Sequence, residues 1–167
     1  MLTRQLLPLM QPGCRIVNTV SCTYAIGRIE PDFFEKGKNG RFFRIPVYGN
    51  TKLALLLFTQ ELAKRIQDKG ITINASDPGI VSTNMITMQA WFDPLTDILF
   101  RPFIKTPAQG AATAIHLALS NEAKDKNGCC YANCKKRNVS ERIRHHAQQK
   151  QLWDDTEILL RQKGIRF

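Results

Sequence analysis

The sequence lacks any apolar stretch long enough to cross a membrane. Charged residues interrupt its hydrophobic segments throughout the 167 residues, so none approaches the roughly 18 consecutive apolar residues of a membrane span. The apolar opening, residues 1–10, contains Arg4 and Gln5 and has no small-residue cleavage site, unlike an export signal. We therefore expect a soluble, cytoplasmic protein without a membrane span. A chain of this length favours a single domain over residues 1–167.

A paired cysteine pattern is also lacking, which argues against a disulfide-rich protein and against a zinc knuckle. The cysteines are an odd number, five, in a chain without an export signal, which favours reduced thiols over a disulfide framework. They lack the paired Cys-x-x-Cys spacing of a zinc knuckle, so we predict no metal site. Their positions are Cys14, Cys22, Cys129, Cys130 and Cys134.

Acidic residues are outnumbered, and the formal net charge of +10 could indicate a polyanionic partner. The basic residues are spread out, however: residues 1–120 contain 13 basic against 8 acidic side chains, and residues 121–167 contain 11 against 6. The cluster at Lys135, Lys136 and Arg137 lacks the interleaved aromatic residues of a nucleic-acid site. We expect a solvated face there, and nucleic-acid binding stays the less favoured alternative.

Apolar periodicity predicts alternating strands and helices. Short β-branched segments at 14–20, 71–76 and 128–132 are typical of buried strands, and a 3.6-residue apolar repeat predicts a long helix over 47–69. Thr106 and Pro107 are the expected N-cap and first residue of another helix. Residues 27–47 are expected to form a long loop, and polar helices are expected over about 140–163. The alternation predicts an α/β parallel sheet of about three strands with flanking helices.

Polar residues lie where an open parallel sheet binds ligands, beyond the carboxyl ends of its strands. Ser21 follows the first predicted strand, and Tyr48 and Lys52 open the long helix. Because Tyr48 and Lys52 are four residues apart, they share one helix face. An ammonium about 4 Å from the phenol, at an effective dielectric near 20, favours the phenolate by on the order of 4 kcal/mol, roughly three pKa units. Tyr48 is thus a candidate proton donor and acceptor, with Ser21 as a second hydrogen-bond donor to the reacting oxygen.

A third segment follows the second predicted strand, and the order of the three segments carries more information than any one of them. Tyr-x-x-x-Lys alone is a weak motif. A strand ending in Ser, then a Tyr/Lys helix, then a strand ending in Pro-Gly-x-Val-x-Thr is far more specific. This order resembles the short-chain dehydrogenase/reductase family, and the stretch from Met1 to about Tyr131 resembles that family's second half, most of all in the retinol-dehydrogenase-like branch. It is carried by Ile16–Ser21, Tyr48–Lys52, Leu57–Ala63 and Phe103–Gly110, and by the 27 positions between Ser21 and Tyr48.

The resemblance implies a Rossmann-like, doubly wound sheet and hydride transfer between NAD or NADP and a hydrophobic alcohol, aldehyde or ketone. Tyr48 would be the general acid/base and Ser21 would hold the reacting oxygen. Lys52 would lower the pKa of Tyr48 and bind the nicotinamide ribose with it. A mobile substrate lid is implied at about 84–105, around Trp91–Ile104. The implied lining of the cofactor consists of Pro78, Gly79, Ile80, Val81 and Thr83.

Several features of that family are absent from the sequence. It contains no Thr-Gly-x-x-x-Gly-x-Gly turn to hold a pyrophosphate, no residue that selects NAD over NADP, and no Asn-Asn-Ala-Gly strand end. The family's catalytic asparagine is missing as well. We therefore expect the carboxyl-terminal portion of the fold only, weak cofactor binding, and an exposed hydrophobic sheet edge that a second copy or a partner covers. The main alternative is a catalytically silent remnant that acts as an interaction or structural module.

Overall fold

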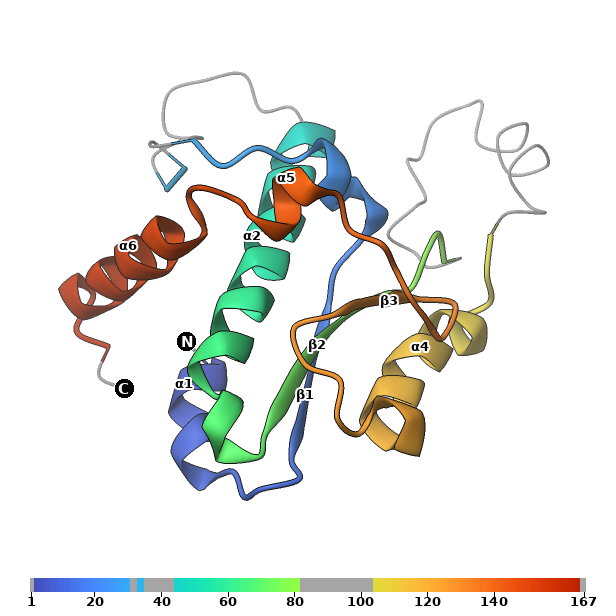
Figure 1. Ribbon diagram of the computed structural model, residues 1–167. Coiled ribbons are helices and arrows are strands. Elements are labelled where there is room, and N and C mark those ends of the chain that lie inside the picture. Colours follow the sequence, from blue (N-terminus) through green and yellow to red (C-terminus); the bar gives the residue numbers. More distant parts are fainter. Residues whose placement is uncertain (1, 31–32, 35–43, 82–103, 166–167) are drawn as a thin grey trace.

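Among the described residues, the sheet contains four strands, of which the first three are parallel (Figure 1). A computed structural model describes residues 2–30, 33–34, 44–81 and 104–165. The strands are β1 (Arg15–Thr19), β2 (Thr72–Asp77), β3 (Cys130–Ala132) and β4 (Lys135–Lys136), in the spatial order β1-β2-β3-β4. In the register, Val17 lies opposite Asn74 and Ala75 lies opposite Cys130. The predicted α/β parallel sheet is confirmed.

The fourth strand was not expected, and the predicted number of about three strands is corrected to four. β4 runs antiparallel to β3 through a two-residue turn at Asn133 and Cys134, which both have positive φ values, 53° and 58°. A tight turn of this hand matches the twist of two antiparallel strands. β4 contains only two lysines, so no apolar alternation marked it in the sequence.

The long helix α2 (Arg44–Arg65) begins earlier than predicted, so the expected loop over 27–47 is wrong at its end. Pro46 lies in the first turn of α2. The backbone N–H groups there have no partner inside the helix, so a proline costs no hydrogen bond. After α2, the short 3-10 helix η3 (Gln67–Lys69) and Gly70, at φ 65°, turn the chain into β2.

Helices cover both faces of the sheet. Ile16 and Ile73 pack on the α2 side, whereas Val17 packs with Leu117 of α4 (Pro107–Leu119) on the other side. This alternation along the strands is what a doubly wound sheet requires. The predicted start of α4 is confirmed, since the Thr106 hydroxyl accepts a hydrogen bond from Gln109 N and the Gln109 side chain accepts one from Thr106 N.

The ends of the chain pack on the outer side of α2. The expected polar helices are α5 (Glu141–Arg144) and α6 (Gln149–Gln162). The 3-10 helix η5 (Asn121–Ala123) precedes β3. Trp153 of α6 stacks on Phe58 of α2 with ring centroids 5.4 Å apart. The chain starts with α1 (Leu2–Leu6) and the 3-10 helix η1 (Leu7–Leu9). The guanidinium of Arg4, in α1, lies 3.0 Å from the carboxylate of Glu157 in α6. Within the described ranges, no helix is long and apolar enough to cross a membrane.

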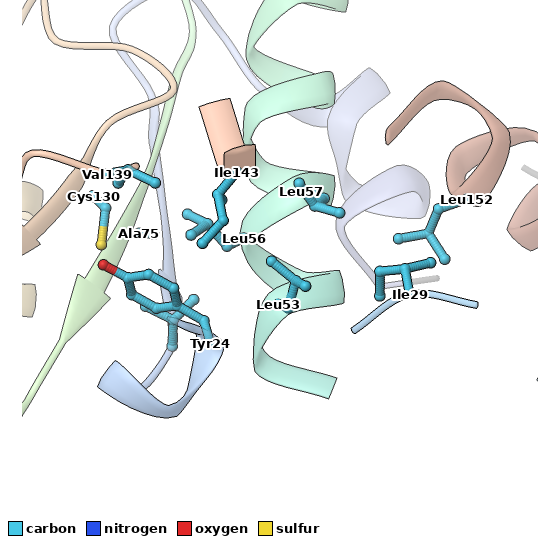
Figure 2. Packing of buried hydrophobic residues seen from close by; sticks show 11 residues of the cluster. Tyr24, Ile29, Leu53, Leu56, Leu57, Ala75, Cys130, Val139, Ile143 and Leu152 are labelled. Carbon is cyan, nitrogen blue, oxygen red and sulfur yellow. The ribbon is translucent and has the colours of Figure 1, made fainter. Parts of the chain in front are cut away.

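The core between α2 and the sheet should dominate stability. Leu57 is fully buried, in the cluster that also holds Leu53 and Leu56 (Figure 2), so Leu57→Ala leaves a cavity and should lower the free energy of unfolding by about 3 kcal/mol. Urea denaturation measures this loss. The same substitution at Leu119, whose side chain is 77% exposed, is the matched control and should cost less than about 1 kcal/mol. Equal losses at the two positions would contradict this account of the core.

Candidate active site

Tyr48 and Lys52 lie on one side of α2, near the carboxyl end of β1. The Lys52 ammonium is 5.3 Å from the centroid of the Tyr48 ring and donates a hydrogen bond of 3.0 Å to the carbonyl oxygen of Thr19, the last residue of β1. The Tyr48 side chain stays 41% exposed. The structure therefore brings the two predicted residues together, with the amine anchored to the strand end and the phenol open to solvent.

Ser21 lies in the segment that follows β1 and caps the 3-10 helix η2 (Cys22–Ile26). Its hydroxyl accepts a hydrogen bond of 3.4 Å from Thr23 N. The backbones of η2 and α2 approach closely, because a Cβ atom added at Gly49 would lie 2.9 Å from the carbonyl oxygen of Thr23. Glycine next to Tyr48 therefore lets the start of α2 lie against the segment that Ser21 begins.

The predicted cofactor segment forms a tight turn after β2. Gly79 has a φ of 78°, which favours glycine, and its N–H donates to the Asp77 carboxylate at 3.0 Å. Lys105 holds the turn from the other side, since its backbone N–H donates to the Ile80 carbonyl and its ammonium donates to the Pro78 carbonyl at 2.9 Å. Val81 forms a parallel bridge with Lys105.

Pro78 to Val81 thus lie at the carboxyl end of β2, beside β1. Because β1 and β2 are parallel neighbours, with Thr19 opposite Ser76, their carboxyl ends share one edge of the sheet. The predicted residue Thr83 and most of the predicted lid, about 84–105, lie outside the described residues; of the lid only Ile104 and Lys105 are described.

A buried carboxylate beside this turn, that of Asp77, was not predicted from the sequence. The Asp77 side chain is only 2% exposed, and its second carboxylate oxygen lies 3.2 Å from the Arg137 guanidinium. An Asp followed by Pro-Gly does signal a side-chain-capped turn. Nothing in the sequence links Asp77 to Arg137, because the two residues are 60 positions apart.

Tyr24 and Cys130 extend this polar group toward η2. Figure 2 shows the Tyr24 hydroxyl directed at the Cys130 sulfur, to which it donates a hydrogen bond. Burial raises the pKa of Cys130 from 9.0 to about 11, and the negative charge of Asp77 adds to this effect. Burial likewise raises the pKa of Tyr24 to about 12, with the Cys130 thiol as a further cause. Both groups are therefore protonated at neutral pH.

A separate apolar cavity of about 320 Å³ lies between α2 and α6. Ala54 and Phe58 of α2 line it on one side, and Leu152 and Trp153 of α6 line it on the other. It contains none of the residues predicted to bind cofactor or to transfer a proton. Within the described ranges, no three His, Cys, Asp or Glu side chains are grouped so that they could hold a metal ion.

Comparison with known proteins agrees with the fold. The family model described as short chain dehydrogenase matches residues 35–91, which include Tyr48, Lys52 and Pro78 to Val81. Over this segment the chain is similar to the short-chain dehydrogenase family, as its motifs predicted.

Among curated proteins, the chain is similar to retinol dehydrogenases. It is 38% identical over 153 residues to retinol dehydrogenase 12 of Mus musculus, covering 92% of this chain and 46% of that protein. It is 34% identical over 167 residues to retinol dehydrogenase 14 of Homo sapiens, covering 96% and 48%. The resemblance to the retinol-dehydrogenase-like branch is thus confirmed, and the chain spans about half the length of these relatives.

Solved structures agree on the fold. A protein of uncharacterized function from Mycobacterium Paratuberculosis aligns with a TM-score of 0.69 at 22% identity, covering 96% of this chain and 54% of that one. A short chain dehydrogenase from Burkholderia cenocepacia in complex with NADP aligns with a TM-score of 0.53 at 22% identity, covering 74% and 45%. The predicted Rossmann-like architecture is confirmed.

The buried Cys130 thiol should make the protein less stable in alkali. Below pH 9 both the folded and the unfolded chain keep this proton, so the stability is complete. Between pH 9 and about 11 the unfolded chain loses the proton while the folded chain keeps it, which lowers the free energy of unfolding by on the order of 2 kcal/mol. Urea denaturation at pH 8 and pH 10.5 measures the loss.

Two cysteine variants locate the source of this pH dependence. Cys130→Ala should lose clearly less stability than the wild type between the two pH values, whereas Cys22→Ala, at an exposed position, should behave like the wild type. If Cys130→Ala kept the full wild-type loss, the thiol would not be its cause.

Proposed function

We propose that this chain forms the proton-transfer and substrate-side portion of an oxidoreductase that moves a hydride between NAD or NADP and a hydrophobic alcohol, aldehyde or ketone. The observation that carries the proposal is the arrangement of Tyr48 and Lys52: an ammonium anchored to the end of β1 lies beside an exposed phenol. The similarity to retinol dehydrogenases supports a long, apolar substrate.

The proton step follows from the chemistry of these side chains. In reduction, the Tyr48 hydroxyl gives its proton to the carbonyl oxygen while the carbonyl carbon receives the hydride; in oxidation, Tyr48 takes the alcohol proton back. Lys52 favours the phenolate that reduction leaves behind, because a nearby cation stabilises an anion. Ser21 donates a second hydrogen bond to the reacting oxygen, which polarises the carbonyl.

The cofactor supplies the hydride, and the residues at this edge fit its nicotinamide end. Gly79 and Ile80 are exposed at the turn after β2, and the positive φ of Gly79 leaves a backbone without a side chain there. Pro78, Gly79, Ile80 and Val81 would line the nicotinamide, and Thr83 is proposed to complete the lining. Tyr48 and Lys52 would bind its ribose. The sequence holds no glycine-rich turn for the pyrophosphate, so binding by this chain is expected to be weak.

A tyrosine substitution tests the proton step. Tyr48→Phe removes the hydroxyl and should lower turnover of a retinal-like aldehyde at saturating NADPH by about 100-fold or more. Turnover is measured on this chain and on a fusion in which a strand and a glycine-rich, pyrophosphate-binding turn are placed upstream of Met1. Tyr131→Phe makes the same change within the separate cluster of Leu117 and Ala123 and should retain turnover. Wild-type turnover by Tyr48→Phe would refute the role of Tyr48.

Cofactor binding distinguishes the proposal from its alternatives. Titration with NADH and NADPH should give saturable binding; no binding even at millimolar cofactor would favour a catalytically silent module. A third possibility, nucleic-acid binding, requires affinity for DNA or RNA that falls steeply with salt. The ion pairs of Arg137 with Asp77 and of Arg144 with Glu141 reduce the charge that this surface offers to a polyanion.

We also infer that a second copy or another protein covers the outer edge of β1. Among the described strands β1 pairs only with β2, and its residues are half-buried where those of β2 are buried. An unpaired strand edge is a template for further pairing. If a second copy covers the edge, light scattering on the isolated chain should give a mass above that of one chain. A monomeric wild type at micromolar concentration would exclude the second copy and leave another protein as the cover.

A further inference from the structure

The turn after β2 is tied to distant parts of the chain by the Asp77 cluster, which we define as Tyr24, Asp77, Cys130 and Arg137. One Asp77 oxygen accepts the N–H of Gly79 and the other accepts from Arg137. A buried carboxylate is costly unless its oxygens are bonded and its charge is paired. Both conditions are met here. A solvent-exposed asparagine or serine would be enough to cap a turn, so capping alone does not account for a buried, charged Asp77.

Arg137 is itself held in place by the strand beside β2. Its backbone N–H donates to the Cys130 carbonyl at 2.7 Å, and its side chain, 48% exposed, covers the Asp77 carboxylate from solvent. The Cys130 side chain accepts from Tyr24 of η2, the segment that begins next to Ser21. The charges of Asp77 and Arg137 both act on Tyr24 and Cys130, so the four side chains form one electrostatic unit.

A second tie reaches the same turn from the β3–β4 hairpin. The Lys105 ammonium donates to the Pro78 carbonyl and, at 2.6 Å, to the side chain of Asn133. The hairpin therefore contacts the turn through two routes, one through Arg137 and one through Asn133. The unexpected strand β4 lies between these two contact residues.

We propose that Asp77 and Arg137 are positioning residues, which fix the Pro78–Gly79 turn relative to the segment that carries Ser21. This inference rests on the proposed function, because those two segments are the ones assigned to the nicotinamide and to the reacting oxygen. The Gly79 N–H is bonded to Asp77, so the turn presents a fixed backbone to a ligand instead of reorganising around it. A preorganised turn binds more tightly because less conformational freedom is lost on binding.

Amide hydrogen exchange tests the positioning role without any cofactor. Arg137→Gln leaves Asp77 without its ion-pair partner, so the Gly79 and Ile80 amides should exchange about tenfold faster or more, while the Leu57 amide keeps its protection. Arg137→Lys, which keeps the charge, should restore part of the protection. Asp77→Ala, which also removes the acceptor of the Gly79 N–H, should have the larger effect. Arg161→Gln, on α6, is the matched control and should leave the turn unchanged.

NADPH titration of the same variants gives the second readout. Arg137→Gln should weaken binding about tenfold, and Arg137→Lys should weaken it less. If the proposed function fails, no variant binds cofactor but the exchange differences remain. Wild-type exchange at Gly79 in Arg137→Gln would overturn the positioning role. An equal loss of protection at the Leu57 amide would also overturn it, because it would mean that the Asp77–Arg137 pair only stabilises the fold. If Asp77→Ala does not fold, the comparison of Arg137→Gln with Arg137→Lys decides.

Discussion

The contact between the start of α2 and the carboxyl end of β1 is the constraint on which both the core and the candidate site depend. At Gly49 the helix backbone lies so close to Thr23 that no side chain fits between them. One turn further along, Lys52 donates to the Thr19 carbonyl, and beyond it Leu53 is fully buried. Moving α2 outward would open the core and separate Tyr48 from the segment of Ser21. Packing and chemistry are therefore fixed by the same helix.

The parallel sheet places the candidate site residues next to this contact between α2 and β1. Because β1 and β2 run side by side in the same direction, the segments after them emerge at one edge, where α2 begins. That edge needs open backbone for ligands, yet its buried polar groups need partners. The Asp77 cluster meets both requirements, since it satisfies a buried carboxylate inside the protein while Gly79 and Ile80 stay exposed above it.

Patterns within short sequence segments predicted the helices and strands that depend on those segments alone. The leucine repeat predicted α2, and β-branched runs predicted the three parallel strands, because each buries an apolar face that its own sequence displays. Thr106 and Pro107 predicted the start of α4 for a similarly local reason. Of the candidate site, the sequence could predict the residues that belong to a motif: Ser21, Tyr48, Lys52 and the Pro78 turn, whose roles stay a prediction. β4 was missed because a pair of lysines has no apolar face, and the Asp77–Arg137 pair was missed because only the fold brings residues 60 positions apart into contact.

Under the proposed function, the distribution of these residues also bears on which half of a dinucleotide the chain would bind. The groups at the strand ends would act on a carbonyl, an alcohol and the nicotinamide ring next to them, where a proton must move and orientation matters most. The pyrophosphate draws its binding energy from a different source, the backbone amides at the start of a glycine-rich turn, and the sequence contains no such turn. An enzyme uses the binding energy of the pyrophosphate and adenosine to position the nicotinamide and the substrate. A site that binds only the nicotinamide end would therefore depend more heavily on a turn that is already rigid. In the positioning role proposed for Asp77 and Arg137, the ion pair behind Gly79 would supply that rigidity from within the chain.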